Sequence, residues 1–258
     1  MLSGSAAPGG DTGAPAEHLH LARSRARFLD PSRSALLPFA ALASLLALFQ
    51  ATNLDLRVQD LFFDHATGSW LVDAQAPLAR WIFYTGPKYL LIIVACTLLL
   101  VVAGFRSIGR PLGLGRRGAI FLFLCLAVVP GIVSVGKSAT GVWCPSQIHR
   151  YGGEMPYVKP WKGQAVGPEG RRGRCFPAGH ASGGFALLGL FFLPEGPVSG
   201  RRGLLLGLSV GWMLGLYQMF KGAHYLSHTL VTMVLAWLIV VVLARLLSVS
   251  PCAHPAVR

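Results

Sequence analysis

The stretch CFPAGH, residues 175–180, combines residue types that could build a reactive centre. Arginines precede it, an apolar run follows it, and Pro177 suits the first turn of a helix because a proline there loses no hydrogen bond. Backbone N–H groups at Ala178, Gly179 and His180 would then attract an anion, and the His180 imidazole could exchange a proton with the group that carries it. The alternative is an ordinary proline-started helix with a surface histidine.

A second group of reactive side chains lies near the end of the chain. His224 and His228 are four residues apart, so they share one face at the start of the last apolar run. Lys221 precedes them, and Lys137 follows the third apolar run. Amines that hold phosphate oxygens, with imidazoles as nucleophile and acid, suit phosphoryl transfer. A zinc site of three histidines is the competing interpretation, although the lysines would repel a cation.

Composition places these residues in a membrane protein. Of the 258 residues, 53% are hydrophobic and 13% are charged, and the mean hydropathy is +0.55. That charged fraction is about half of what a soluble domain carries. The formal net charge of +13 is distributed over short basic clusters between apolar runs. This pattern favours lipid headgroups or phosphorylated substrates as partners, without nucleic acid and without an obligate protein partner.

Six apolar segments approach the length of about 20 residues that crosses a membrane. They lie at 35–52, 89–105, 118–135, 177–193, 203–220 and 225–247. We therefore predict an all-α integral membrane bundle of six transmembrane helices over residues 34–250. Residues 1–33, rich in Gly, Ala, Pro, Ser and Arg, are predicted to be a disordered cytoplasmic tail, and residues 251–258 a short C-terminal tail.

Basic residues in the short loops predict the orientation of the bundle. Arginines are concentrated in the N-terminal tail, in the loop 106–117 and at residues 201–202. Six spans would put all three on one side, so this side and both termini are predicted to be cytoplasmic.

Three regions then face outward. Residues 53–88 are rich in aromatics and are expected to lie along the membrane surface in a structural role. The region that starts at Lys137 is strongly basic, which an anionic substrate or acidic lipid headgroups would explain. The third region is the turn 221–228. With six spans, the second and third outer regions lie on the same side of the membrane. The two lysines and the three histidines are therefore predicted to share a common outer face.

The order of these motifs resembles the phosphatidic acid phosphatase type 2 and haloperoxidase superfamily. The matching residues are Lys137 with Cys144-Pro145, the run 176–180, and the run 222–228. The resemblance implies a six-helix core and a metal-independent active site at one face. It makes Lys137 a phosphate ligand, Ala178 and Gly179 backbone donors, His180 the acid that protonates the leaving group, His224 the nucleophile that forms a phosphohistidine, and His228 the residue that orients it.

Four positions depart from the pattern of that family. Cys144 and Gln218 stand where the family usually has arginines, Ala178 stands where it has serine, and His228 replaces the acid that orients the nucleophile. Two phosphate-binding arginines are thus missing. We expect the basic residues Lys221, Arg150 and Arg174 to replace them.

The cysteines fall into two groups. Cys96 and Cys125 lie inside apolar segments and are expected to be packing residues. Cys144 and Cys175 both fall in the second outer region, each beside a motif. In an oxidising periplasm they could form a disulfide that closes about 30 residues and draws the loop after Lys137 toward His180.

The sequence thus predicts a membrane phosphatase that needs no metal or cofactor. It would hydrolyse a phosphomonoester or pyrophosphate on a lipid at the periplasmic face of a bacterial inner membrane, with membrane lipids around it. Two alternatives stay open: a lipid phosphotransferase that uses the same phosphohistidine, and a catalytically silent binder or transporter of anionic lipids.

Overall fold

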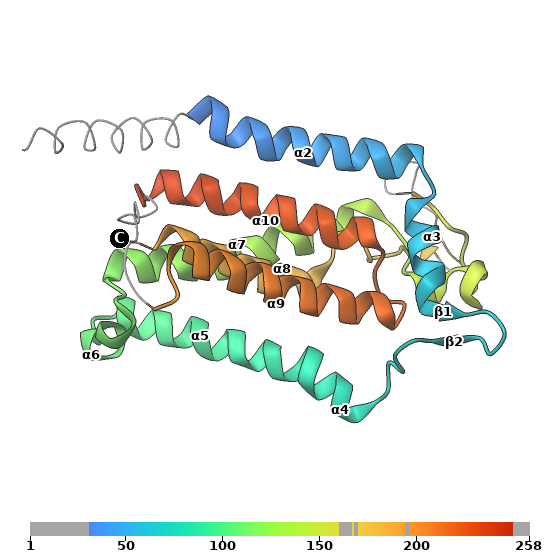
Figure 1. Cartoon of the computed structure of the whole chain (residues 1–258), viewed down its shortest axis with the longest axis horizontal. Helices are drawn as coiled ribbons and strands as arrows, with labels where there is room; N and C mark the ends of the chain where they lie inside the picture. Colours follow the sequence, from blue (N-terminus) through green and yellow to red (C-terminus); the bar gives the residue numbers. More distant parts are fainter. Residues whose placement is uncertain (1–30, 160–166, 168–169, 194–196, 250–258) are drawn as a thin grey trace, which may run out of the picture.

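The chain folds into a bundle of long helices (Figure 1). The computed structural model describes residues 31–159, 167, 170–193 and 197–249. The helices of the bundle are α2 (Pro31–Ala51), α5 (Gly86–Val102), α7 (Arg116–Thr140), α8 (Gly179–Ala186), α9 (Gly200–Phe220) and α10 (Leu226–Leu246). The 3-10 turn η7 (Leu187–Phe192) continues α8. The predicted tails 1–33 and 251–258 lie outside the described residues, except that Pro31 to Arg33 belong to α2.

The bundle is that of a membrane protein, but the described residues do not contain six evident spans. Within them, four helices are long and apolar enough to cross a membrane, and they occupy Pro77–Val102, Arg116–Gln147, Gly200–Phe220 and Leu226–Leu246. Helix α2 passes the same test only together with α3 (Leu54–Gln59) and η1 (Asp60–Phe62), from which it is bent by 80°. The predicted fourth span is a shorter apolar helix, Gly179–Phe192.

The fourth segment is short because its beginning lies inside the bundle. Helix α8 starts at Gly179 and not at Pro177, and the N–H of the preceding Ala178 donates to the Thr232 hydroxyl at 2.8 Å. Thr232 belongs to the second turn of α10. The start of α8 therefore lies beside the second turn of α10, deeper in the bundle than the start of α10.

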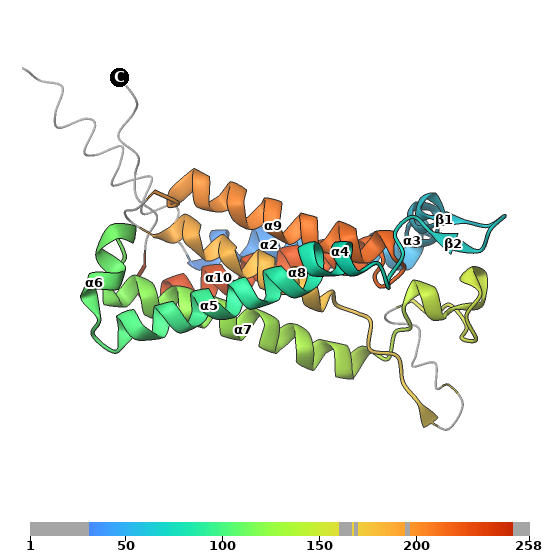
Figure 2. The same cartoon turned by 90° about the horizontal axis from the view of Figure 1, so that it is seen from below.

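The two ends of the bundle carry different segments, as Figures 1 and 2 show. Helix α6 (Arg106–Gly109), the start of α2 and the start of α9 share one end. The opposite end carries α3, the hairpin of β1 (Phe63–Asp64) and β2 (Ser69–Trp70), and the 3-10 turns η4 (Pro145–Gln147) and η5 (His149–Tyr151). The two expected basic segments that the structure describes, residues 106–117 and 201–202, thus lie at the same end.

Residues 53–88 form more than a surface segment. After the hairpin, α4 (Pro77–Arg80) and the π-turn η2 (Trp81–Thr85) run directly into α5. The side chain of Gln59 donates to the backbone carbonyl of Met219 at 2.8 Å, and the Val72 N–H donates to the carbonyl of Phe220 at 3.2 Å. These bonds hold the region against the last turn of α9, next to the third predicted outer turn.

Glycines let α8 and α9 approach closely. A Cβ atom placed on Gly184 would lie 2.7 Å from the Cα of Gly211, and one placed on Gly207 would lie 2.7 Å from the backbone N of Leu188. Small residues at such crossings increase packing between membrane helices, where lipid supplies little hydrophobic driving force. Cys125 is buried at this core, as predicted, whereas Cys96 is exposed on α5 and the expectation that it packs inside is wrong.

The Gly184 crossing provides a stability test. Gly184→Ala should lower the stability of the detergent-solubilised protein by about 1–3 kcal/mol, because the added methyl group overpacks a backbone contact. Gly131→Ala is the matched control, since a Cβ there meets nothing within 4 Å. Thermal unfolding of both variants checks this; equal melting temperatures would contradict the close crossing.

Candidate active site

The first turn of α8 presents backbone donors, but Ala178 is not one of them. Its N–H is taken up by Thr232, so the expectation that Ala178 supplies a free N–H to an anion is wrong in this structure. Gly179, His180 and Ala181 form the first turn, where N–H groups have no partner within the helix. The N–H groups without a partner in the helix therefore start one residue later in the chain than predicted.

Lys137 lies directly over this turn. A Cβ atom placed on Gly179 would be 3.1 Å from the Lys137 ammonium nitrogen and 3.0 Å from its Cε. A larger residue at position 179 would require the end of the lysine side chain to shift by a few tenths of an ångström. The Arg174 guanidinium donates to the Ser138 hydroxyl at 3.0 Å, so it lies one residue beyond Lys137. The structure brings these predicted phosphate ligands together.

A tight turn between α9 and α10 positions His224. The Gln218 carbonyl accepts hydrogen bonds from the N–H groups of Ala223 at 2.8 Å and His224 at 3.3 Å. Gly222 adopts a positive φ of 73°, and a Cβ there would overlap the Trp70 indole. Gln218 itself is 3% exposed. Position 218 holds an arginine in the related family. Here its backbone carbonyl shapes the turn 221–225, which carries His224.

The two histidines of the third motif face each other. The Nδ1 atoms of His224 and His228 are 3.3 Å apart, and His228 is 1% exposed in the first turn of α10. In neutral imidazoles one nitrogen must donate and the other accept. If His224 donates from Nδ1, its Nε2 keeps a lone pair, which is the form a nucleophile needs.

Burial and positive charge keep His224 neutral. Burial lowers the pKa of His224 well below its ordinary value, and the positive charge of Lys137 acts in the same direction. Lys137 and His224, nearly 90 positions apart in the chain, therefore lie in one site. The convergence predicted from the number of spans is confirmed for these two residues.

The predicted disulfide between Cys144 and Cys175 is present. It joins residues 31 positions apart, and the Cys175 sulfur lies 3.5 Å from the Nδ1 of His224. The disulfide therefore holds the loop before α8 against the turn that carries His224.

His180 is held by an aromatic side chain that sequence reasoning missed. Its ring stacks on Tyr84 with ring centroids 3.8 Å apart, and the Lys221 ammonium lies 5.0 Å from the centroid of the Tyr84 ring. Lys221 is also 4.9 Å from the Tyr217 ring. Burial, and then the charge of Arg80, lower the pKa of Lys221. The aromatic richness of residues 53–88 was a signal for the membrane surface, and it gave no indication of this contact.

Arg150 does not join the site. Its guanidinium makes two hydrogen bonds to the Asp60 carboxylate, at 2.8 and 2.7 Å, and Asp60 also accepts from the Tyr151 hydroxyl at 2.9 Å. The Arg150 guanidinium and the Tyr151 hydroxyl hold the pKa of Asp60 below its ordinary value. The structure thus gives Arg150 a structural partner in place of the predicted phosphate.

A buried carboxylate supports the start of α10. Asp55, which is 3% exposed, accepts hydrogen bonds from the Ser227 N–H at 2.8 Å and from its hydroxyl at 2.5 Å. Burial raises the pKa of Asp55 to about 6. No motif marked this residue in the sequence, since its partner lies 172 positions away.

Metal-ligating atoms are gathered at one point among the described residues. Cys175, His224 and His228 each offer one atom, and these atoms lie within 4.8 Å of one another. The Cys175 sulfur is bonded to Cys144, so it is not a free thiolate. His180 is not in the group, which does not match the three-histidine zinc alternative.

A cavity of about 380 Å³ opens beside the site. Gly179, His180 and Tyr84 line one part of it together with Lys88. The remaining walls are mostly apolar and come from α5, α7, α8 and α9: Leu91, Ile92, Ala95, Leu126 and Leu214. The polar groups thus lie at one end of a space that hydrocarbon can fill.

Thiol counting tests the disulfide. Alkylation of the denatured, unreduced protein should leave Cys144 and Cys175 unmodified, and prior reduction should add two labels, as read by peptide mass analysis. Cys144→Ser is the control, because it should expose Cys175 to label without reductant. Labelling of both residues in the unreduced parent would contradict the bridge.

Comparison with known proteins agrees with this geometry. A sequence model of the PAP2 superfamily matches residues 118–250, which include Lys137, the start of α8 and the turn that carries His224. No curated protein and no solved structure matches the chain. Because the matched segment covers half of the chain and carries every motif described above, the chain belongs to the PAP2 superfamily, whose members are phosphatases that act on phosphate esters.

Proposed function

We propose that the chain is a membrane phosphatase that hydrolyses a lipid phosphomonoester or pyrophosphate through a phosphohistidine on His224. The observation that carries the proposal is the placement of His224, His180 and Lys137 around the start of α8, beside a cavity with apolar walls. No metal or cofactor is needed in this scheme, because two lysines supply the positive charge.

In the first step the Nε2 lone pair of His224 attacks phosphorus. The contact between the Nδ1 atoms of His224 and His228 supports this role, since a proton held there fixes the tautomer. A new N–P bond forms as the P–O bond to the lipid breaks. His228 is neutral, so it stabilises the resulting imidazolium less than a carboxylate would.

In the proposed cycle His180 is protonated while the anionic substrate is bound beside it, and it gives this proton to the leaving oxygen. Stacking on Tyr84 holds its ring at the start of α8, facing the cavity. After the lipid alcohol leaves, His180 takes a proton from water while the water oxygen attacks the phosphohistidine. The N–P bond breaks, and inorganic phosphate is released with His224 restored.

Two lysines and a helix end would hold the phosphate oxygens. Lys137 lies against Gly179, whose N–H belongs to the first turn of α8, and the Lys221 ammonium lies 5.0 Å from the centroid of the Tyr84 ring. Arg174 extends the positive charge through its contact with Ser138. Positive charge and helix N–H groups stabilise the equatorial oxygens, where charge spreads in the transition state.

The cavity supports a lipid as the carrier of the phosphate. A small polar phosphate ester would leave the walls at Leu91, Ile92 and Leu214 without a partner. The disulfide supports a site on the outer face of a bacterial inner membrane, since such bridges persist in an oxidising compartment. Transfer of the phosphoryl group to a second lipid would use the same intermediate.

Loss of phosphate release in two variants tests the enzyme against a silent binder. Purified protein should release phosphate from phosphatidate in detergent micelles, and His224→Ala or His180→Ala should reduce this by about a thousandfold or more. A chelator should have no effect. Unchanged release in His224→Ala would sink the phosphohistidine, and no release by the parent on any phosphorylated lipid would favour the binder.

A pair of basic residues tests the phosphate site. Lys137→Met should lower kcat/KM by at least about tenfold, because a hydrogen bond to a charged group contributes about 1.5–3 kcal/mol. Arg150→Met should stay within about threefold of the parent, since its partner is the partly exposed Asp60. Equal losses in the two variants would show that Arg150 also contacts the substrate.

A further inference from the structure

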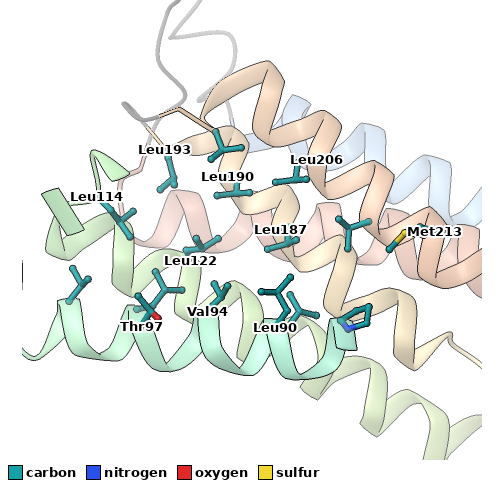
Figure 3. A pocket seen from close by; sticks show the side chains of 16 residues that line it. Leu90, Val94, Thr97, Leu114, Leu122, Leu187, Leu190, Leu193, Leu206 and Met213 are labelled. Carbon is teal, nitrogen blue, oxygen red and sulfur yellow. The ribbon is translucent and has the colours of Figure 1, made fainter. Parts of the chain in front are cut away.

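A second cavity, of about 390 Å³, lies between the helices of the bundle. Side chains from α5, η7 and α9 surround it, and Leu114 and Leu193 lie at the end away from Met213 (Figure 3). Thr97 is the single polar side chain among its lining residues, and its hydroxyl donates to the Ile93 carbonyl at 2.8 Å. The cavity therefore offers a ligand no unpaired polar group, and its chemistry suits a hydrocarbon.

This cavity adjoins the one beside His180. Pro87 and Leu91 line both. They belong to a stripe on one face of α5 that starts at the site, with spacings of three or four residues: Tyr84, Pro87, Leu91, Val94, Leu98 and Val101. The stripe covers about 25 Å of helix, close to the hydrocarbon thickness of a bilayer.

Apolar side chains are exposed around the cavity. Leu90 is 62% exposed, Leu206 is 39% exposed and Met213 is 40% exposed, and all three line the space. In a membrane these positions face lipid, so a chain can enter sideways from the bilayer. Such an entry requires no passage through the polar end of the protein.

The charges around the two cavities match an anionic amphiphile. Lys88 lines the site cavity, and Lys137 and Lys221 lie near His180, which places positive charge at one end. The second cavity contributes no charged side chain to its lining. A ligand that fits both has an anionic head and one long hydrocarbon tail directed along α5.

We propose that the second cavity binds the hydrocarbon chain of the phosphorylated substrate, and that the α5 stripe selects lipids by the length of this chain. The inference rests on the proposed phosphatase activity and names its substrate class: a phosphorylated lipid with a long chain that leaves the bilayer and lies inside the protein. Val94 lines the second cavity about one helix turn beyond Leu91, which lines both cavities, so the proposed passage of the chain from one cavity to the other runs past Val94.

Monomeric n-alkyl phosphates of about four to ten carbons test this proposal, because in water each methylene moved into an apolar site contributes about fourfold in kcat/KM. The parent should show this increase with chain length. Val94→Trp should lower the ratio of long-chain to short-chain kcat/KM by about tenfold or more, since the indole fills the passage. Ile93→Trp, on an adjacent residue that is 61% exposed and lines neither cavity, should keep the parent ratio.

Met213→Trp, at the exposed rim on α9, gives a second route if Val94→Trp does not fold, and it should lower the same ratio. A parent ratio retained in a folded Val94→Trp or Met213→Trp protein overturns the proposal. The proposal is also overturned if these variants keep the parent ratio but change their oligomeric state. That result would indicate that a second copy of the chain covers the cavity. Failure of the parent to hydrolyse any alkyl phosphate would instead count against the proposed phosphatase.

Discussion

The hydrogen bond from the Ala178 N–H to the Thr232 hydroxyl fixes how the two reactive motifs meet. Thr232 in turn donates to the His228 carbonyl at 2.7 Å, so the start of α8 is tied to the first two turns of α10. An unsatisfied N–H in hydrocarbon costs several kcal/mol, which makes this link hard to lose. It places His180, two residues further along, beside the turn that carries His224.

Two lysines give the site its positive charge. Lys137 contacts Gly179, and Lys221 lies over aromatic rings, so in the described part of the chain neither lysine is paired with a carboxylate. Positive charge held in a low dielectric attracts an anion strongly. The charge of Lys137 also adds to the effect of burial in lowering the pKa of His224. In the proposed mechanism, substrate binding and the neutral form of His224 would therefore depend on one arrangement of charge.

Much of this arrangement could be predicted from local patterns. The predicted apolar runs overlap every long helix of the bundle, because hydropathy and helix length are properties of consecutive residues. The number of runs between the motifs then predicted that Lys137, His180 and His224 lie on the same side of the membrane. The pairing of Cys144 with Cys175 followed from their positions beside the motifs. These inferences required only the order of segments along the chain.

The sequence by itself thus determined the helices, the motifs and the basic character of the site, whereas the tertiary structure decided which partner each polar group takes. Arg150 pairs with Asp60, Tyr84 stacks on His180, and Asp55 binds Ser227 across 172 positions. The physical reason is that hydrogen bonds and ring contacts act over about 3 to 6 Å. Such distances are set by how helices cross and how deep α8 begins, and no local pattern encodes them.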